Sequence, residues 1–268
     1  FTRRDVGTSV SMSKNITEKL LSTGTYMIRN TDISDVDETE EKSSENYDFA
    51  SIKLQATHDT RNDIFFPTSG QRIFASAEQA EEFLGSSINL SRVTGGARFF
   101  HELTRSTVIG ARYTTGLLVP GRDEITLPLA ERFFNGGENT VRSFKESELG
   151  PQNSKGDPIG GYGFNTINIE LRQRLIDNLI GSVFVDYGNI SPNRSREEQG
   201  KSPYDSRSDV ISDTFDDFFK GFRPGVGFGF QYLLPVVPAR IDFAFNPDRD
   251  SKRDEDFFVF HISVGTAF

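Results

Sequence analysis

The chain ends in DFFVFHISVGTAF (residues 256–268), where apolar side chains alternate with small or polar ones. In an extended strand, one face would carry the apolar row Phe258, Phe260, Ile262, Val264, Thr266 and Phe268. Chain ends usually fray, so a long strand that runs to an aromatic last residue indicates anchoring at a membrane interface. An edge strand of a soluble β-sandwich is the alternative, because alternation alone does not tell which face meets water.

The same two-residue period recurs upstream. Between Phe222 and Tyr232, aromatic and aliphatic residues alternate with glycine or polar residues, and in 240–246 and 167–172 apolar residues alternate with charged or amide ones. The pattern predicts about eleven strands. They lie near 5–14, 19–30, 47–59, 70–80, 90–102, 106–118, 164–175, 181–189, 222–232, 240–246 and 256–268. We therefore predict an all-β fold, an antiparallel transmembrane β-barrel.

The predicted connections alternate in length. Short turns are expected around Thr104-Arg105, Asn178 and 235–238, whereas the connections 31–46, 120–162 and 191–220 are long, polar and rich in acids or Gly and Ser. Short turns at one rim and long loops at the other are typical of outer-membrane barrels. This regularity favours a barrel in the bacterial outer membrane, in contact with outer-membrane lipids.

The composition excludes several classes of protein. The formal net charge of −9 and the pI near 5.0 disfavour a basic nucleic-acid-binding protein. No run of about 18 apolar residues exists, so α-helical membrane spans are excluded, while a mean hydropathy of −0.45 leaves a barrel open because only every second strand residue faces lipid. There is no Cys, and 25 Phe with 24 Gly and no Trp is unusual for a helical protein.

Catalytic and metal-binding signals are missing from the sequence. Neither a Gly-x-Ser-x-Gly nor a His-Glu-x-x-His motif occurs, and His58, His101 and His261 fall on different predicted strands. The acidic run 35–41 does not have the glycine and spacing of a calcium loop, and Gly160–Gly163 precedes a strand rather than a helix. We expect no enzyme activity, no cofactor and no metal site.

The connection 120–162 is too long to lack a role, and its composition is not that of a disordered segment. It holds the run Arg132-Phe133-Phe134-Asn135-Gly136-Gly137 and the run Val141-Arg142-Ser143-Phe144. If this loop folds into the barrel lumen, the polar faces of the next two strands offer Glu170 and Asp186 to Arg142. A guanidinium can bridge two carboxylates, which Lys cannot do with the same geometry. The alternative is that Arg142 is an exposed loop cation.

These two runs, with Asp59–Gly70 (DTRNDIFFPTSG), resemble the surface-antigen superfamily of outer-membrane assembly factors. BamA is the nearest type, and TamA and two-partner secretion transporters are relatives. The loop residues Arg132, Phe133, Phe134, Gly136 and Gly137 and the tip residues Val141, Arg142, Ser143 and Phe144 resemble the inward-folding loop of that superfamily. Ser143 stands where the superfamily usually has Gly, which tolerates a positive φ that Ser tolerates poorly. The resemblance implies that Glu170 and Asp186 are the acidic partners of the tip arginine.

The resemblance also implies a domain organisation. Of an expected sixteen strands about eleven are visible, so residues 1–268 would be the carboxyl-terminal part of a barrel, with the remaining strands and any periplasmic POTRA repeats upstream. No POTRA segment is recognisable in the sequence, and eleven strands alone would leave an open edge in lipid.

The implied function is that of an insertase core, which inserts and folds unfolded β-barrel client proteins with accessory lipoproteins or other periplasmic subunits as partners. The seam strand, with Phe258, Phe260, Ile262, Val264, Gly265 and Phe268, would offer its edge to client strands. Gly265 would either permit a kink or be a small lumen-facing residue. The alternatives are a two-partner secretion pore and a barrel that anchors an upstream hydrolase domain.

Overall fold

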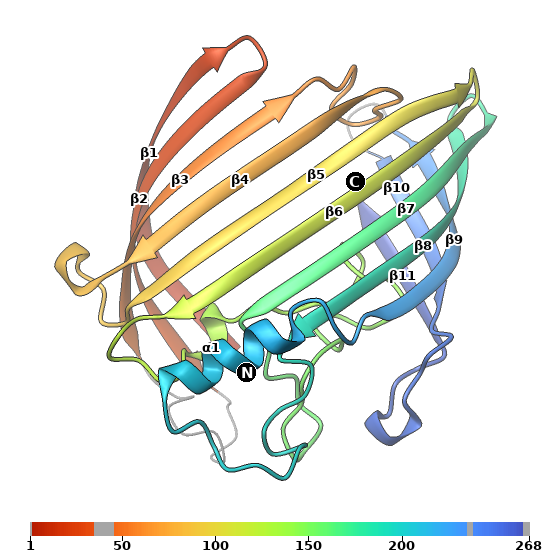
Figure 1. Cartoon of the computed structure of the whole chain (residues 1–268). Helices are drawn as coiled ribbons and strands as arrows, with labels where there is room; N and C mark the ends of the chain where they lie inside the picture. The colour runs from red at the N-terminus through yellow and green to blue at the C-terminus, as the bar shows by residue number, and fades with distance from the viewer. Residues whose placement is uncertain (1, 35–45, 235–237, 265–268) are drawn as a thin grey trace.

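One continuous antiparallel sheet of eleven strands makes up the protein in the computed structural model, which describes residues 2–34, 46–234 and 238–264 (Figure 1). Each strand pairs only with its neighbours in sequence, in the order β1 to β11. The strands are β1 (Thr2–Thr17), β2 (Leu20–Ser34), β3 (Tyr47–Asp59), β4 (Gly70–Ala80), β5 (Leu90–Thr104), β6 (Thr107–Pro120), β7 (Gly163–Ile176), β8 (Leu179–Ser191), β9 (Arg223–Leu233), β10 (Pro238–Phe245) and β11 (Phe258–Val264).

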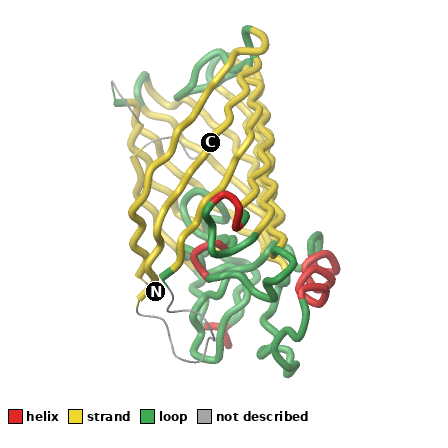
Figure 2. Tube along the Cα trace, turned by 90° about the vertical axis from the view of Figure 1, so that its left-hand side faces the viewer, coloured by secondary structure: helices red, strands yellow, loops and turns green. Residues whose placement is uncertain are grey.

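The predicted all-β, antiparallel barrel architecture is confirmed, and every predicted strand has its counterpart. The sheet curves into a wall that encloses an interior (Figure 2). Within the described residues the wall is not closed, because β1 and β11 pair with β2 and β10 and not with each other.

The apolar face of the strands is the exposed, outer face. On β9, Phe228 and Phe230 are 40% and 42% exposed, whereas Gln231 on the opposite face is 8% exposed. Aromatic rings form a ladder across three strands on this outer face, with centroids 5.1 Å apart for Phe228 and Phe243 and 5.3 Å apart for Phe243 and Phe260. No second sheet covers these rings in the described part of the chain, so the sandwich alternative is wrong.

The connections that the structure describes alternate as the sequence predicted, whereas most of the expected long loop 31–46 and of the expected turn 235–238 lies outside the described residues. Two-residue turns follow β1, β5 and β7 at one rim, whereas the long connections 121–162 and 192–222 lie at the other rim, at the bottom of Figure 1. The turn after β3 is organised by its own polar side chains, since Asp63 accepts hydrogen bonds from the amides of Phe65 and Phe66, both at 2.7 Å. The strands therefore pack as a meander whose long loops gather at one end.

Helix α1 (Arg207–Asp217) was not predicted, because 191–220 reads as polar loop. Its amino-terminal cap is Ser206, whose hydroxyl accepts a hydrogen bond from the Asp209 amide at 3.3 Å. The helix buries Val210 against loop and strand-end residues at the long-loop rim, so tertiary packing stabilises this short element. The other helical turns are the 3₁₀ segments η1 (Glu82–Leu84), η2 (Leu129–Glu131) and η3 (Ser251–Arg253).

No helix in the described ranges is both long enough and apolar enough to cross a bilayer.

Candidate functional site

The connection between β6 and β7, residues 121–162, folds back against the polar, inner face of the sheet (Figure 2). Val141, Phe144 and Leu149 of this loop form a buried cluster with Ile190 of β8. Small residues on β8 let the loop approach, since a Cβ added at Gly188 would come within 2.5 Å of the Val141 side chain. Burial of these apolar side chains holds the loop on the wall.

Arg142, at the tip of this loop, is 1% exposed and lies between two carboxylates of the wall. Its Nε and Nη2 donate to Asp186 Oδ2 and Oδ1, both at 2.8 Å, and its backbone amide donates to Asp186 Oδ2 at 3.1 Å. Its Nη1 donates to Glu170 Oε2 at 2.8 Å. One guanidinium thus connects β7 and β8 through a bidentate ion pair with Asp186 and a single hydrogen bond to Glu170, a geometry that an ammonium group cannot provide.

A third carboxylate, a phenyl ring and a histidine also contact Arg142. Asp242 of β10 lies 3.6 Å from its Nη1, and the Phe184 ring centroid lies 3.3 Å from its Cζ. His261 of β11 contacts the Arg142 carbonyl oxygen through Nε2 at 2.7 Å. Burial opposes the charged guanidinium, but Asp186, Glu170 and Asp242 outweigh it and raise the pKa of Arg142. The tip residue is therefore a permanent cation that contacts four strands.

Polar side chains of the wall extend this network. Asn168 donates through Nδ2 to Asp186 Oδ1 and to the Thr140 carbonyl, both at 2.7 Å, and its Oδ1 accepts from Arg112. Arg240 pairs with Asp242 on β10. Glu170 and Asp186 were predicted from the sequence as partners of Arg142, whereas Asp242, Arg240, Arg112 and Asn168 were not, although all four lie on the polar faces of their strands. Arg112, Asn168 and Asp186 meet because they are cross-strand partners on β6, β7 and β8.

Ser143 adopts no positive φ, so its backbone does not need glycine at this position. Its side chain is buried, and the hydroxyl donates to the Pro224 carbonyl at 3.3 Å. The facing residue on β9 is Gly225, where an added Cβ would lie 2.4 Å from Ser143 Oγ. The space for this serine side chain comes from the opposing glycine.

The loop run 132–137 is held by side-chain hydrogen bonds to loop carbonyls, by ring packing on β7 and by two glycines with positive φ. Arg132 donates to the carbonyls of Leu127 and Ile159 at 2.9 and 3.1 Å, and Phe133 packs on Phe164 with ring centroids 4.8 Å apart. Gly136 and Gly137 have φ values of 100° and 110°, which explains the glycine pair. A Cβ added at Gly160 would lie 2.9 Å from the ring of Phe134, which therefore packs on the returning limb of the loop.

The seam-strand residues face outward on β11, the last described strand. Phe258, Phe260, Ile262 and Val264 are all exposed, and β11 pairs with β10 from Phe258 to Val264. Gly265 and Phe268 lie outside the described residues.

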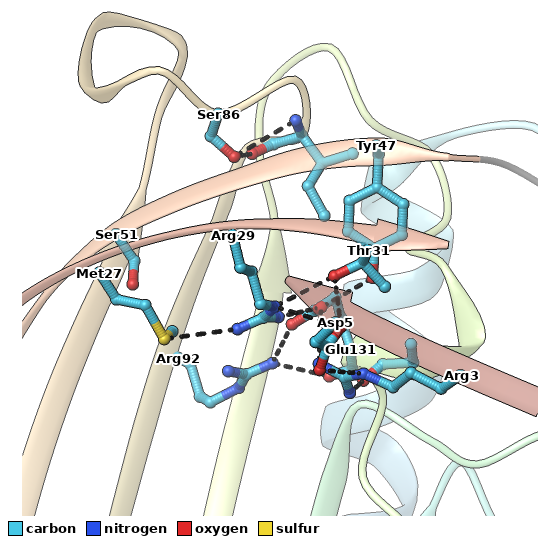
Figure 3. A network of polar contacts seen from close by, with 12 residues as sticks. Arg3, Asp5, Met27, Arg29, Thr31, Tyr47, Ser51, Ser86, Arg92 and Glu131 are labelled. Atoms are coloured by element: carbon cyan, nitrogen blue, oxygen red, sulfur yellow. Dashed lines mark hydrogen bonds and ion pairs between the residues drawn. The ribbon is translucent and has the colours of Figure 1, made fainter. Parts of the chain in front are cut away.

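Glu131, directly before the loop motif, makes a second polar network that the sequence analysis missed (Figure 3). It is 2% exposed, pairs with Arg29 and with Arg92 at 3.0 Å, and accepts a hydrogen bond from the Tyr47 hydroxyl at 2.8 Å. The available signal was that Arg29 and Arg92 fall on the inward parity of their strands, opposite exposed Ile28 and Val93.

Among the residues that the structure describes, the site consists of buried ion pairs and hydrogen bonds that join the loop to the wall. No group of three or more His, Cys, Asp or Glu side chains that could hold a metal ion occurs among the residues that the structure describes. The arrangement can hold a loop against a wall, and it can release that loop if the ion pairs are broken.

A curved antiparallel sheet with an oily outer face and a polar interior defines an outer-membrane β-barrel protein. The chain belongs to the Omp85 superfamily, whose domain matches residues 1–268.

Among curated relatives, the outer membrane protein assembly factor BamA of Nitratidesulfovibrio vulgaris is 22% identical over 273 aligned residues, which cover 100% of this chain and 32% of that protein. The sorting and assembly machinery component 50 homolog of Bos taurus is 30% identical over 118 residues, covering 42% of this chain and 24% of that protein. The chain thus spans about a quarter to a third of the length of these relatives.

Two solved structures share the fold. BamA from Haemophilus ducreyi lacking POTRA domains 1–3 superposes with a TM-score of 0.76 at 18% identity, covering 98% of this chain and 54% of that one. CdiB from Acinetobacter baumannii superposes with a TM-score of 0.58 at 12% identity, covering 98% of this chain and 41% of that one. Both likenesses concern the fold of the barrel.

Proposed function

We propose that this chain is the barrel core of an outer-membrane insertase, which folds and inserts unfolded β-barrel client proteins into the lipid bilayer without covalent catalysis. The observation that carries the proposal is the loop tip, which Arg142, Glu170 and Asp186 hold against the inner face of the wall. The alignment with a BamA relative, which covers the whole of this chain, supports it. The loop occupies the interior that a wide channel would need to keep open.

The proposed mechanism is strand pairing at the free edge of β11. Among the described residues β11 pairs with β10 only, so its other edge is where the seam would open and offer amide and carbonyl groups to an incoming strand. In a bilayer such groups carry a large free-energy penalty, so an extended client strand that pairs with them is strongly favoured. Outer-membrane lipids, client proteins and accessory lipoproteins or other periplasmic subunits are the partners that this function requires.

Site-specific photocrosslinking in the full-length protein, reconstituted in liposomes, tests this mechanism. A photoreactive residue at Ile262, outward on β11, is expected to capture an unfolded barrel client during its insertion. The matched control is the same residue at Phe228, which shares the outward face but lies on β9, inside the sheet.

Equal capture of the client at both positions would count against edge pairing. Normal insertion of clients by protein whose edge at Ile262 is already blocked by a crosslink would also overturn the mechanism. Transport of a soluble passenger into the liposomes, without insertion of barrel clients, would favour a secretion pore instead.

A further inference from the structure

Glu131 connects the loop to strands β1, β2, β3 and β5, whereas Arg142 contacts strands on the other side of β6. Its carboxylate pairs with Arg29 of β2 and Arg92 of β5, accepts from Tyr47 of β3, and lies 3.9 Å from Arg3 of β1 (Figure 3). The backbone of the same turn is also held, because Arg3 donates to the Ala130 carbonyl at 2.7 Å and Arg92 to the Glu131 carbonyl at 2.8 Å. Four strands therefore meet one carboxylate.

The charges at this place require a carboxylate from the loop. Among the described residues, the wall places three arginines here, Arg3, Arg29 and Arg92, and two carboxylates, Asp5 and Glu78. Asp5 pairs with Arg3 at 2.8 Å and lies 3.9 Å from Arg29, and Glu78 pairs with Arg92 at 2.9 Å. Glu131 is the least exposed of the three acids, with 1% of its side chain accessible. Without it, the wall would keep an uncompensated cation in a partly buried position, which is costly.

We propose that the loop is a strut anchored at both ends of the sheet, with Glu131 as the positioning residue of its second anchor. The first anchor is the cation Arg142, which lies against β7, β8 and β10 and touches β11 through His261. The second is the anion Glu131, which lies against β1, β2, β3 and β5.

A strut between the two parts of the wall sets their spacing near the edges of the sheet. The segment between Glu131 and Arg142 also contacts the wall, since Asn135 Nδ2 donates to the carbonyls of Asn165 and Asn189 at 3.3 and 3.1 Å. We expect the two anchors to be coupled through this shared segment, so that loss of either loosens it and loss of both adds little more. The strut positions the loop that the proposed insertion function uses, and only the last readout of the following test rests on that function.

Limited proteolysis of the full-length protein in lipid tests the strut. Glu131→Gln keeps the shape of the side chain and removes its charge, and we expect the rate of cleavage between about 127 and 160 to rise about tenfold. Arg142→Gln is expected to raise the rate of cleavage as well, and the double variant is expected to resemble the more affected single variant. The matched control is Glu18→Gln, the same change at an exposed turn between β1 and β2.

Spin labels measure the spacing directly. We place them at Glu82→Cys and Ser251→Cys, two exposed rim positions after β4 and β10, and expect Glu131→Gln to broaden their distance distribution. Heat-modified electrophoretic mobility of each variant shows that its barrel is folded, and Tyr47→Phe, which removes one hydrogen bond to Glu131 and no charge, should act weakly in the same direction.

Several outcomes overturn the strut. Unchanged cleavage and unchanged spacing in Glu131→Gln would remove the second anchor, and multiplied effects in the double variant would make the anchors independent contacts. Both results leave the proposed insertion function untouched. Conversely, loss of client insertion in Arg142→Gln together with normal insertion in a loosened Glu131→Gln would show that the second anchor has no part in that function.

Discussion

Arg142 is one side chain that hydrogen-bonds two carboxylates of the wall, Asp186 and Glu170, and lies 3.6 Å from a third, Asp242, while its backbone amide also donates to Asp186. The rigid fork of the guanidinium makes this possible, because its nitrogen atoms lie in one plane and point in fixed directions. Arg142, Glu170 and Asp186 could be chosen from the sequence, since both acids lie on the polar parity of their strands. The third acid, Asp242, lies on β10, far from Arg142 in the chain, and the pairing of β10 with β9 and of β9 with β8 brings it near.

Replacement of Arg142 by Ala should loosen the loop while the strands stay paired. It leaves Asp186 and Glu170 buried beside an empty space, and removing one partner of a buried pair costs about 3–5 kcal/mol. We expect new protease cleavage between about 127 and 160, with unchanged heat-modified mobility of the barrel. Cleavage at the wild-type rate would show that burial of this arginine does not hold the loop.

The two acidic partners should differ in importance. Asp186 accepts three hydrogen bonds from Arg142, whereas Glu170 accepts one and is also held by Arg172 at 2.8 Å. In Asp186→Asn, the new amide NH₂ group would face N–H donors of Arg142 or Asn168, and a hydrogen bond would be lost. The loop of this variant should therefore exchange its amide hydrogens about tenfold faster than the loop of Glu170→Gln. The reverse order in a hydrogen-exchange experiment would assign the main role to Glu170.

Individual strands present glycines where the loop comes closest. Gly188 on β8 faces Val141, and Gly225 on β9 faces Ser143, in positions where a Cβ would overlap the loop. The alternation of glycine with aromatic residues in 222–232 predicted the strand, but not that its glycines make room for a loop from elsewhere in the sequence. That assignment requires knowledge of what packs on the inner face.

The close approach of Ser143 to Gly225 is testable with a reciprocal pair of substitutions. Gly225→Ala should displace the tip, because its Cβ would lie 2.4 Å from Ser143 Oγ and 2.9 Å from Ser143 Cβ. Overpacking of this kind costs about 1–3 kcal/mol. The added change Ser143→Gly removes both atoms and should restore protection of the loop from protease. A double variant as sensitive as Gly225→Ala would disprove the contact.

The molecule as a whole has an apolar outer face and a polar interior. On the outward rows of β9 and β11, the aromatic residues Phe228, Phe230, Tyr232, Phe258 and Phe260 are 40–48% exposed, while Asp242 and Arg240 on the inner face of β10 are almost completely buried. Strand number, order and the alternation of short turns with long loops were all predictable, because side-chain period and turn composition are local properties. Helix α1 was not, since its stability comes from packing at the rim.

A charge on the outer belt should destabilise the protein in lipid. Phe228→Arg places a guanidinium at the hydrocarbon, with an expected cost of about 2–4 kcal/mol near the bilayer midplane. The measurement is the denaturant midpoint of heat-modifiable folding in liposomes, and the control is Asp177→Arg in the turn between β7 and β8. Equal midpoints for both variants, or a stable chain in solution without detergent, would contradict the membrane orientation.

The fold class and the strands could be predicted from residue order, and so could the candidate pairing of the tip arginine with Glu170 and Asp186, because alternation and turn chemistry act over a few neighbouring residues. Which face is the outer one was decided by the tertiary structure, since alternation alone does not tell which face meets water. The third acid, the Glu131 network, the glycine-to-loop contacts and helix α1 follow from the three-dimensional arrangement. Each joins residues far apart in sequence, and their distances depend on how strongly the sheet curves and where the loop re-enters. Curvature is a property of all strands together, so no single segment encodes it.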